Sequence, residues 1–248
     1  SEYLEGVLRG KSASSVALFP QYRDVLELVG EERIHPADLW PLEWRWVDMG
    51  MPTQVNALAY DPAVRARMDS AVLKMVKSGS VSATKALRDI SLGLAAAQKT
   101  PESRVFWNIG AAFFEAVALR LCPTDVYVKR AAARILMQYT ALARGGQDVS
   151  DRLAQDLLFF CSQEAGANPE DAPVLAAVRQ AYGLGQSAMV DYETVQFGRF
   201  DPALLVQVRK RIATATETWS ALAGGDTNRL KVVSDQFNLV SEALLRLH

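Results

Sequence analysis

Apolar residues recur every three or four positions along most of the chain after residue 52. This spacing places them on one face of an α-helix, whereas a half-buried β-strand would show strict alternation. Strand alternation is absent here, and so are the Asn-Gly and Asp-Gly pairs that form tight hairpin turns. The pattern therefore predicts an all-α protein.

Proline, glycine and small polar residues divide this pattern into successive helices. A capping residue, often followed by proline, begins several of them, and glycine ends several. Asp61-Pro62 is a candidate break in the first helix, and three glycines weaken any helix prediction for 183–200. The expected helices span residues 53–77, 82–98, 101–121, 125–144, 151–165 and 173–182, followed by two helices around 205–222 and 230–247.

The last two expected helices carry the most regular apolar stripes, with spacings that alternate between three and four. The short turn at Gly224-Gly225 separates them. Two such stripes joined by a short turn predict an antiparallel helical hairpin, with Phe237 enclosed in its core. The stripes are Leu205, Val208, Ile212, Ala215, Trp219 and Leu222, then Leu230, Val233, Phe237, Val240, Leu244 and Leu247.

Residues 1–50 differ in character from the helices that follow. Short helices are expected at 3–8 and 16–29, and a single helical turn is expected after residue 34. Three of the five tryptophans gather in this region. Trp carries so much apolar area that we expect the region to pack as an arm across the helices, although the same residues are candidates for a protein-interaction surface. These tryptophans are Trp40, Trp44 and Trp46.

The helix count suggests three parts: an arm at 1–50, a four-helix bundle at 51–146 and a second four-helix bundle at 147–248. Antiparallel bundles of this size resemble histidine phosphotransfer domains. The helices are similar in length and no long linker separates them. One fused helical domain is therefore an equal alternative.

Composition excludes several classes of function. The chain has 248 residues, is 50% hydrophobic and 22% charged, and carries a formal net charge of −1. This balance is ordinary for a globular protein and predicts no attraction to nucleic acid or to an anionic membrane. The longest apolar run, 105–119, is interrupted by Asn108 and Glu115 and falls short of the ~20 residues of a spanning helix. We therefore expect no membrane insertion.

The two cysteines, Cys122 and Cys161, are isolated in apolar helical contexts. We expect buried, unpaired thiols rather than a disulfide or metal ligands, which is typical of a reducing cytoplasm. The opening residues do not show a signal-peptide pattern, and we expect none. The chain begins at Ser1 without methionine, and we expect it to be part of a longer protein.

His35 is the residue of the arm with the largest number of possible chemical roles. A general base needs an orienting partner and a metal needs three or four ligands, yet the other histidine, His248, is at the chain end. A phosphotransfer histidine lies within a helix and is followed by Lys and Gly three and four residues later. Here those positions are Asp38 and Leu39, and Pro36 excludes a helix interior. We interpret His35 as a hydrogen-bonding residue at the start of a turn, and we expect no catalytic, metal or cofactor-binding residue.

Two further features of the sequence could indicate a ligand-binding or catalytic site. Gly183 to Ala188 matches the GxGxxA pattern of a dinucleotide-binding turn, but that turn must follow a strand, and the preceding residues are helical in pattern. We interpret it as a helix break. Glu115, which lies in an apolar stripe, and Asp156 are expected to be buried carboxylates and would be the first suspects if the chain were an enzyme or a small-ligand binder with a pocket between bundles.

Two strings in the arm, ALFPQYRDVLELVG and ERIHPADLWP, resemble a known family. They are similar to the N-terminal region of the CheA-like hybrid histidine kinases of type IV pilus chemosensory systems. They are also similar to a related pilus regulatory scaffold that lacks the kinase. The match is concentrated in residues 17–46. The family's kinase, ATP-binding and receiver motifs are missing from this chain.

The resemblance implies a cytoplasmic, degenerate phosphotransfer-like module in a twitching-motility signalling pathway. Its partners would be proteins of that chemosensory or pilus-regulation pathway, and it would have no enzymatic activity of its own. Within the arm, the candidate interaction residues are His35, Trp40, Trp44 and Trp46. The sequence leaves the oligomeric state open.

Overall fold

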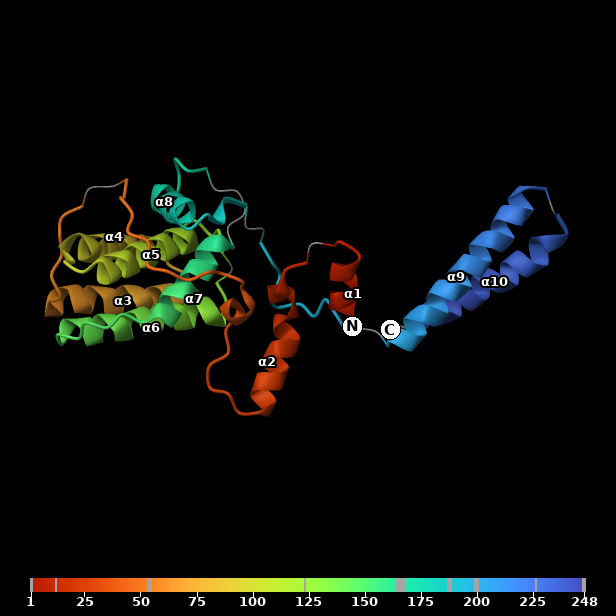
Figure 1. The fold of residues 1–248 in the computed structure, drawn as a ribbon, viewed down its shortest axis with the longest axis horizontal. Coiled ribbons are helices and arrows are strands. Elements are labelled where there is room, and N and C mark those ends of the chain that lie inside the picture. Colours follow the sequence, from red (N-terminus) through yellow and green to blue (C-terminus); the bar gives the residue numbers. More distant parts are fainter. Residues whose placement is uncertain are drawn as a thin grey trace.

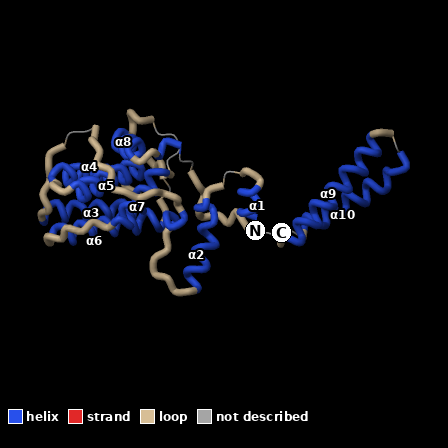
Figure 2. The backbone as a smooth tube through the Cα atoms, in the orientation of Figure 1, coloured by secondary structure: helices blue, strands red, loops and turns tan. Residues whose placement is uncertain are grey.

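The computed structural model describes residues 2–11, 13–52, 55–122, 124–163, 168–186, 189–198, 201–225 and 227–246. These ranges contain ten α-helices and no strand, which confirms the all-α prediction (Figure 2). The helices are α1 (Glu2–Leu8), α2 (Phe19–Leu28), α3 (Pro62–Ser78), α4 (Val81–Ala97), α5 (Pro101–Ala118), α6 (Val126–Ala143), α7 (Asp151–Ser162), α8 (Pro173–Ala181), α9 (Pro202–Ala223) and α10 (Leu230–Leu245). Four short 3₁₀ turns accompany them: η1 (Ser15–Leu18), η2 (Pro36–Leu39), η3 (Leu184–Gln186) and η4 (Thr227–Arg229).

The start of α3 corrects the expected helix at 53–77. The Asp61 carboxylate accepts a hydrogen bond from the Val64 N–H at 2.8 Å, and Pro62 occupies the first turn. Both features begin a helix, so Asp61-Pro62 is a start rather than a break. Residues 55–61 instead run along α4, where the Leu58 N–H donates to the Gly93 carbonyl at 2.8 Å. A Cβ at Gly93 would lie 2.6 Å from Leu58 Cγ, so this approach requires glycine.

Helices α3 to α8 form one body with α5 at its centre (Figure 1). Every residue of α5 from Val105 to Ala118 is buried. Helices α4, α7 and α8 all pack against α5, while α3 packs on α4 and α6. A helix that is apolar all round needs neighbours on every side, which explains why α5 takes the central place.

Helices α7 and α8 pack with the helices of the first half of the chain. Their main contacts are with α5 and α6, whereas α9 and α10 pack chiefly against each other. This arrangement differs from the grouping expected for 147–248. The division of the chain into domains stays a prediction, and this packing favours a boundary between α8 and α9.

The α9–α10 hairpin lies apart from the body (Figure 1). Val208, Ala215 and Val233 are buried between its two helices, as the stripes predicted. Phe237, however, is 50% exposed, so the expectation that it is enclosed in the hairpin core was wrong. Leu247 and His248 lie outside the described residues.

The arm runs across the body after α2. Trp40 reaches Phe159 on α7, Trp44 reaches Tyr182 at the end of α8, and Asp48 pairs with Arg104 on α5. Its partly buried apolar residues join the main core, and Phe19 of α2 is fully buried against Tyr127 and Tyr192.

Both cysteines are buried and unpaired, as predicted. Burial raises the pKa of the Cys122 thiol to about 12 and raises the pKa of Cys161 as well. The thiolate is the reactive form, so both groups should be inert at neutral pH. We expect a thiol reagent to modify both cysteines slowly in the native chain and rapidly after denaturation. Fast reaction of either thiol in the native state would contradict this burial.

Candidate interaction site

His35 begins the η2 turn through local hydrogen bonds. Its Nδ1 accepts from the Ala37 N–H at 3.1 Å, and the Asp38 carboxylate accepts from the His35 N–H at 3.1 Å. The two bonds form a reciprocal capping box, and Pro36 supplies a preset backbone angle at the first position. The sequence His-Pro-Ala-Asp therefore folds into this turn for local reasons.

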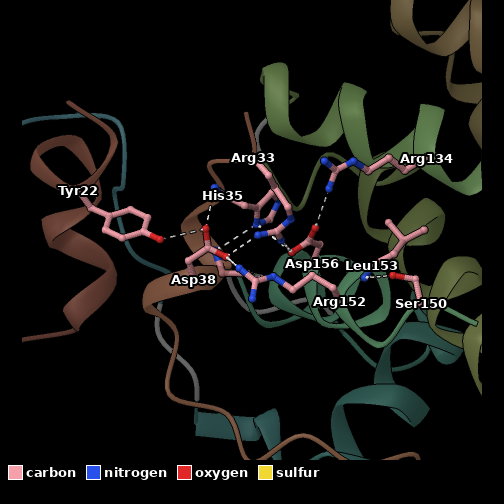
Figure 3. Close-up of polar contacts among 10 residues, drawn as sticks. Tyr22, Arg33, His35, Asp38, Arg134, Ser150, Arg152, Leu153 and Asp156 are labelled. Carbon is pink, nitrogen blue, oxygen red and sulfur yellow. Dashed lines mark hydrogen bonds and ion pairs between the residues drawn. The ribbon is translucent and has the colours of Figure 1, made fainter. Parts of the chain in front are cut away.

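A cluster of charged residues fixes this turn to the body (Figure 3). Arg33 of the arm bridges two carboxylates, with its guanidinium 2.7 Å from Asp38 and 2.5 Å from Asp156 of α7. Arg152 of α7 pairs with Asp38, and Arg134 of α6 lies 3.4 Å from Asp156. The cluster thus joins the arm, α6 and α7 through three arginines and two nearly buried aspartates.

His35 is neutral inside this cluster. Burial, and then the nearby Arg33 charge, lower the pKa of His35 to about 3. Its Nδ1 lies 3.4 Å from Asp156, but that nitrogen already accepts the Ala37 N–H, so the pair is not an ion pair at neutral pH. Burial also raises the pKa of Asp156, against the effect of Arg33.

The His35 imidazole packs among aromatic side chains, and its second ring nitrogen is buried. Nε2 is buried and has no hydrogen-bond partner among the described residues. The imidazole meets Tyr127, Phe159 and Phe160 edge to face, with ring centroids 5.4 to 6.1 Å apart. These contacts leave His35 buried, with only 5% of its surface exposed.

The buried neutral His35 should make stability depend on pH. The unfolded residue takes up a proton near pH 6.5, whereas the folded one stays neutral down to about pH 3. In this window the unfolded chain binds more protons, so the free energy of unfolding falls as pH is lowered. His35 alone should remove about 2 kcal/mol between pH 7.5 and pH 5.

The His35→Asn variant provides the control, because asparagine can cap the turn but does not titrate. Subtracting its denaturant-derived free energy of unfolding from that of the wild type at each pH cancels the other groups, including Asp156, whose raised pKa acts in the opposite sense. Relative to the variant, the wild type should lose about 2 kcal/mol of its free energy of unfolding between pH 7.5 and pH 5. A constant difference across this range would contradict a neutral, buried His35.

The three tryptophans of the arm are half-buried against the body. Trp40 meets Phe159 edge to face at 5.8 Å. Trp44 stacks on Tyr182 with centroids 6.1 Å apart and also contacts Trp46 at 4.8 Å. These contacts favour a structural role for the tryptophans, while the partly exposed edges of Trp44 and Trp46 stay reachable from solvent.

Sequence reasoning did not identify Arg134, Arg152 and Tyr182 as partners of the arm. Arg152 and Asp156 are four residues apart on α7, which places them on one helix face. That spacing is the one local signal for the cluster. The link from Arg33 to Asp156 spans more than a hundred residues and has no signature in a single sequence.

Glu115 has a structural partner. Its side chain is buried in α5, and its carboxylate accepts the Leu175 N–H at 2.7 Å, in the first turn of α8. Arg88 of α4 lies 3.5 Å away on the other side. Burial raises the pKa of Glu115, opposed by the Leu175 hydrogen bond and by Arg88. The carboxylate satisfies free N–H groups at the start of α8 and so attaches this helix to α5.

The described pockets do not favour the enzyme or ligand-binding alternative. One pocket of about 430 Å³ lies beside Cys122 and Tyr192. Neither Glu115 nor Asp156 lines any of the four described pockets. Among the described residues, no group of His, Cys, Asp or Glu side chains is arranged to hold a metal ion. The Gly183 turn follows helix α8 rather than a strand, and the pattern's last two residues lie outside the described ranges.

No described helix combines the length and the apolar composition that crossing a membrane requires.

Comparison with known proteins places the chain in a family. Neither the curated proteins nor the solved structures contain a match. The family model described as "FimL scaffold protein second domain" matches residues 53–195, which include all of α3 to α8 and end before α9. The arm, whose strings carry the resemblance to pilus proteins, precedes the matched region. Of the two groups that the arm resembles, the match agrees with the scaffold that lacks a kinase. Because the matched residues make up more than half of the chain, it belongs to the FimL scaffold protein family, with residues 53–195 corresponding to the second domain.

Proposed function

We propose that this chain is a non-catalytic, phosphotransfer-like scaffold module of a type IV pilus chemosensory pathway that controls twitching motility. In this proposal it acts in the cytoplasm and binds other proteins of that pathway. The scaffold description of the family and the resemblance of residues 17–46 to pilus chemosensory proteins support this assignment.

The burial of His35 carries the non-catalytic part of the proposal. A phosphotransfer domain needs an imidazole exposed on a helix face. His35 is instead 5% exposed, caps a 3₁₀ turn and packs edge to face against Phe160. The buried carboxylates that would be the next candidates for chemistry, Glu115 and Asp156, are engaged in internal contacts.

A phosphorylation assay tests this part. The native chain is incubated with a purified kinase core of a pilus chemosensory system and ATP, beside an intact phosphotransfer domain as positive control. We expect the positive control to gain acid-labile phosphate and this chain to remain unlabelled. Labelling of His35 in the native chain would refute a degenerate, non-catalytic module.

Binding assays test the scaffold part. The native chain is titrated calorimetrically with each purified soluble protein of the pathway, and saturable binding to at least one is expected. The double variant Trp40→Ala/Trp44→Ala then separates two roles of the arm. Lower thermal stability with binding retained at low temperature supports the structural role that we expect. Unchanged stability with binding lost would instead make the tryptophans a recognition surface.

A further inference from the structure

The α9–α10 hairpin buries only half of its apolar stripe. In each helix the heptad spacing produces two rows of residues, and one row lies between the helices. The buried row consists of small residues such as Val208, Ala215 and Val233. The second row carries the large residues, with Trp219 53% exposed and Phe237 50% exposed. The larger part of the stripe is therefore uncovered.

The two uncovered rows lie on the same side of the hairpin. Residues seven apart return to nearly the same side of a helix, so each row continues along its helix. The Trp219 and Phe237 rings belong to different rows, and their centroids are 6.1 Å apart, which joins the rows into one surface. We call this surface the open face. It consists of Leu205, Ile212 and Trp219 from α9 and Leu230, Phe237 and Leu244 from α10.

The open face has the geometry of half a four-helix bundle. In such a bundle both heptad rows of every helix point toward the centre, whereas an isolated helix pair needs only a narrow seam. The six side chains leave on the order of 500 Å² of apolar surface exposed, near the upper limit for a patch on an ordinary monomer. The fitting partner is another pair of amphipathic helices.

A second copy of the chain meets the requirements of this surface. Charged residues of the two helices lie mostly on the opposite side of the hairpin, at Lys210, Glu217, Asp235 and Glu242. The positions that border the open face include Arg209 and Thr216, seven residues apart on α9, and Ser234 and Ser241 on α10, so Arg209 is the one charge among these four. A face with so little charge does not repel its own copy, and small bordering side chains allow helices to approach closely.

Size and position also favour pairing. A helical hairpin of about 40 residues with a core of small side chains lies at the size limit below which domains usually need oligomerisation or another support. Two open faces together would bury about 1,000 Å², the lower limit for a specific interface. Because the hairpin extends away from the body, a second copy has access to the face (Figure 1).

We propose that the open face of the α9–α10 hairpin pairs with the same face of a second copy and forms a four-helix bundle that joins two chains. The resulting dimer presents two α3–α8 bodies. A scaffold built this way binds partners bivalently, which raises its overall affinity for partners that are themselves multivalent. The dimer is independent of which pathway protein the bodies bind.

Sedimentation velocity on the native chain, from about 1 to 100 μM, tests the proposal over the range expected for an interface of this size. The wild type should shift from monomer to dimer with increasing concentration. Ile212→Asp/Phe237→Asp should remain monomeric, because it places four carboxylates in the paired faces. Val206→Asp/Leu239→Asp is the matched control: both residues are exposed and apolar, but the helical repeat puts them on other sides of their helices than the open-face rows, so this variant should dimerise as the wild type does.

A crosslinking experiment keeps the test decisive if the charged variant unfolds the hairpin. Both native cysteines are buried and slow to react, so a new surface cysteine can be oxidised selectively. Phe237→Cys should form a covalent dimer under mild oxidation, and Val206→Cys should not. A wild type that stays monomeric at the highest concentration overturns the proposal, whether its open face is bare or covered by another segment or protein. Equal crosslinking at both positions would also overturn it.

Discussion

Replacement of Leu87 by alanine is expected to lower the free energy of unfolding by about 3 kcal/mol, within the range of roughly 2 to 5 kcal/mol for buried leucines. Leu87 lies on α4, is fully buried, and belongs to the core that α4 shares with α3 and α5. Its removal takes away apolar contacts and leaves a cavity. Neighbouring helices fill that cavity only in part because α5 is held on several sides.

Leu73→Ala supplies the matched control, since it makes the same chemical change on α3 at a side chain that is 53% exposed. We expect it to cost less than about 1 kcal/mol. Urea denaturation followed by far-ultraviolet circular dichroism measures both variants. Equal losses for Leu73→Ala and Leu87→Ala would mean that α4 is not enclosed by the body.

Local features of the fold could be predicted from the sequence. Helices α4 to α8 begin within about one residue of the starts that capping residues and prolines predicted, because a helix start depends on a few neighbouring residues. The interpretation of His35 as a hydrogen-bonding residue at a turn is confirmed for the same reason, since its partners Ala37 and Asp38 are two and three residues away.

Contacts between distant elements could not be predicted in the same way. The helical pattern of α7 and α8 shows that each has an apolar face but does not identify the helix that covers it. Their attachment to α5 depends on long-range contacts such as the hydrogen bond from Leu175 to Glu115. The same limit explains the error at Phe237: the stripe marks it as apolar and helix-facing, but half of it is uncovered in this chain.

The family assignment shows the same contrast between a short, local signal and a signal spread over many helices. The resemblance came from residues 17–46, because they contain rare residues in a recognisable order. The matched region, 53–195, consists of ordinary amphipathic helices whose pattern fits many all-α proteins. Its identity depends on the summed sequence of six helices, and no single string within it is diagnostic.

Replacement of Asp156 by alanine is expected to destabilise the chain by about 3 kcal/mol and to loosen the arm, because breaking a buried ion pair leaves a charge without its partner. Asp156 is 2% exposed. Its carboxylate accepts a hydrogen bond from the Arg33 guanidinium at 2.5 Å and lies 3.4 Å from the guanidinium of Arg134. Without it, Arg33 and Arg152 would share Asp38, and Arg134 would lose the carboxylate beside it. Arg33 keeps some solvent access, which places the expected loss at the lower end of the roughly 3 to 5 kcal/mol range for such changes.

The exposed pair between Asp48 and Arg104 provides the control, because it also joins the arm to the body. Asp48→Ala should cost less than about 1 kcal/mol, since solvent screens an exposed pair. Limited proteolysis adds a readout specific to the arm: Asp156→Ala should be cut within residues 29–52 faster than the wild type, at a temperature where α3–α8 remains folded by circular dichroism. The buried cluster, rather than the number of ion pairs, would then hold the arm in place. If Asp48→Ala and Asp156→Ala had equal effects on stability and cleavage, the cluster would not be the anchor.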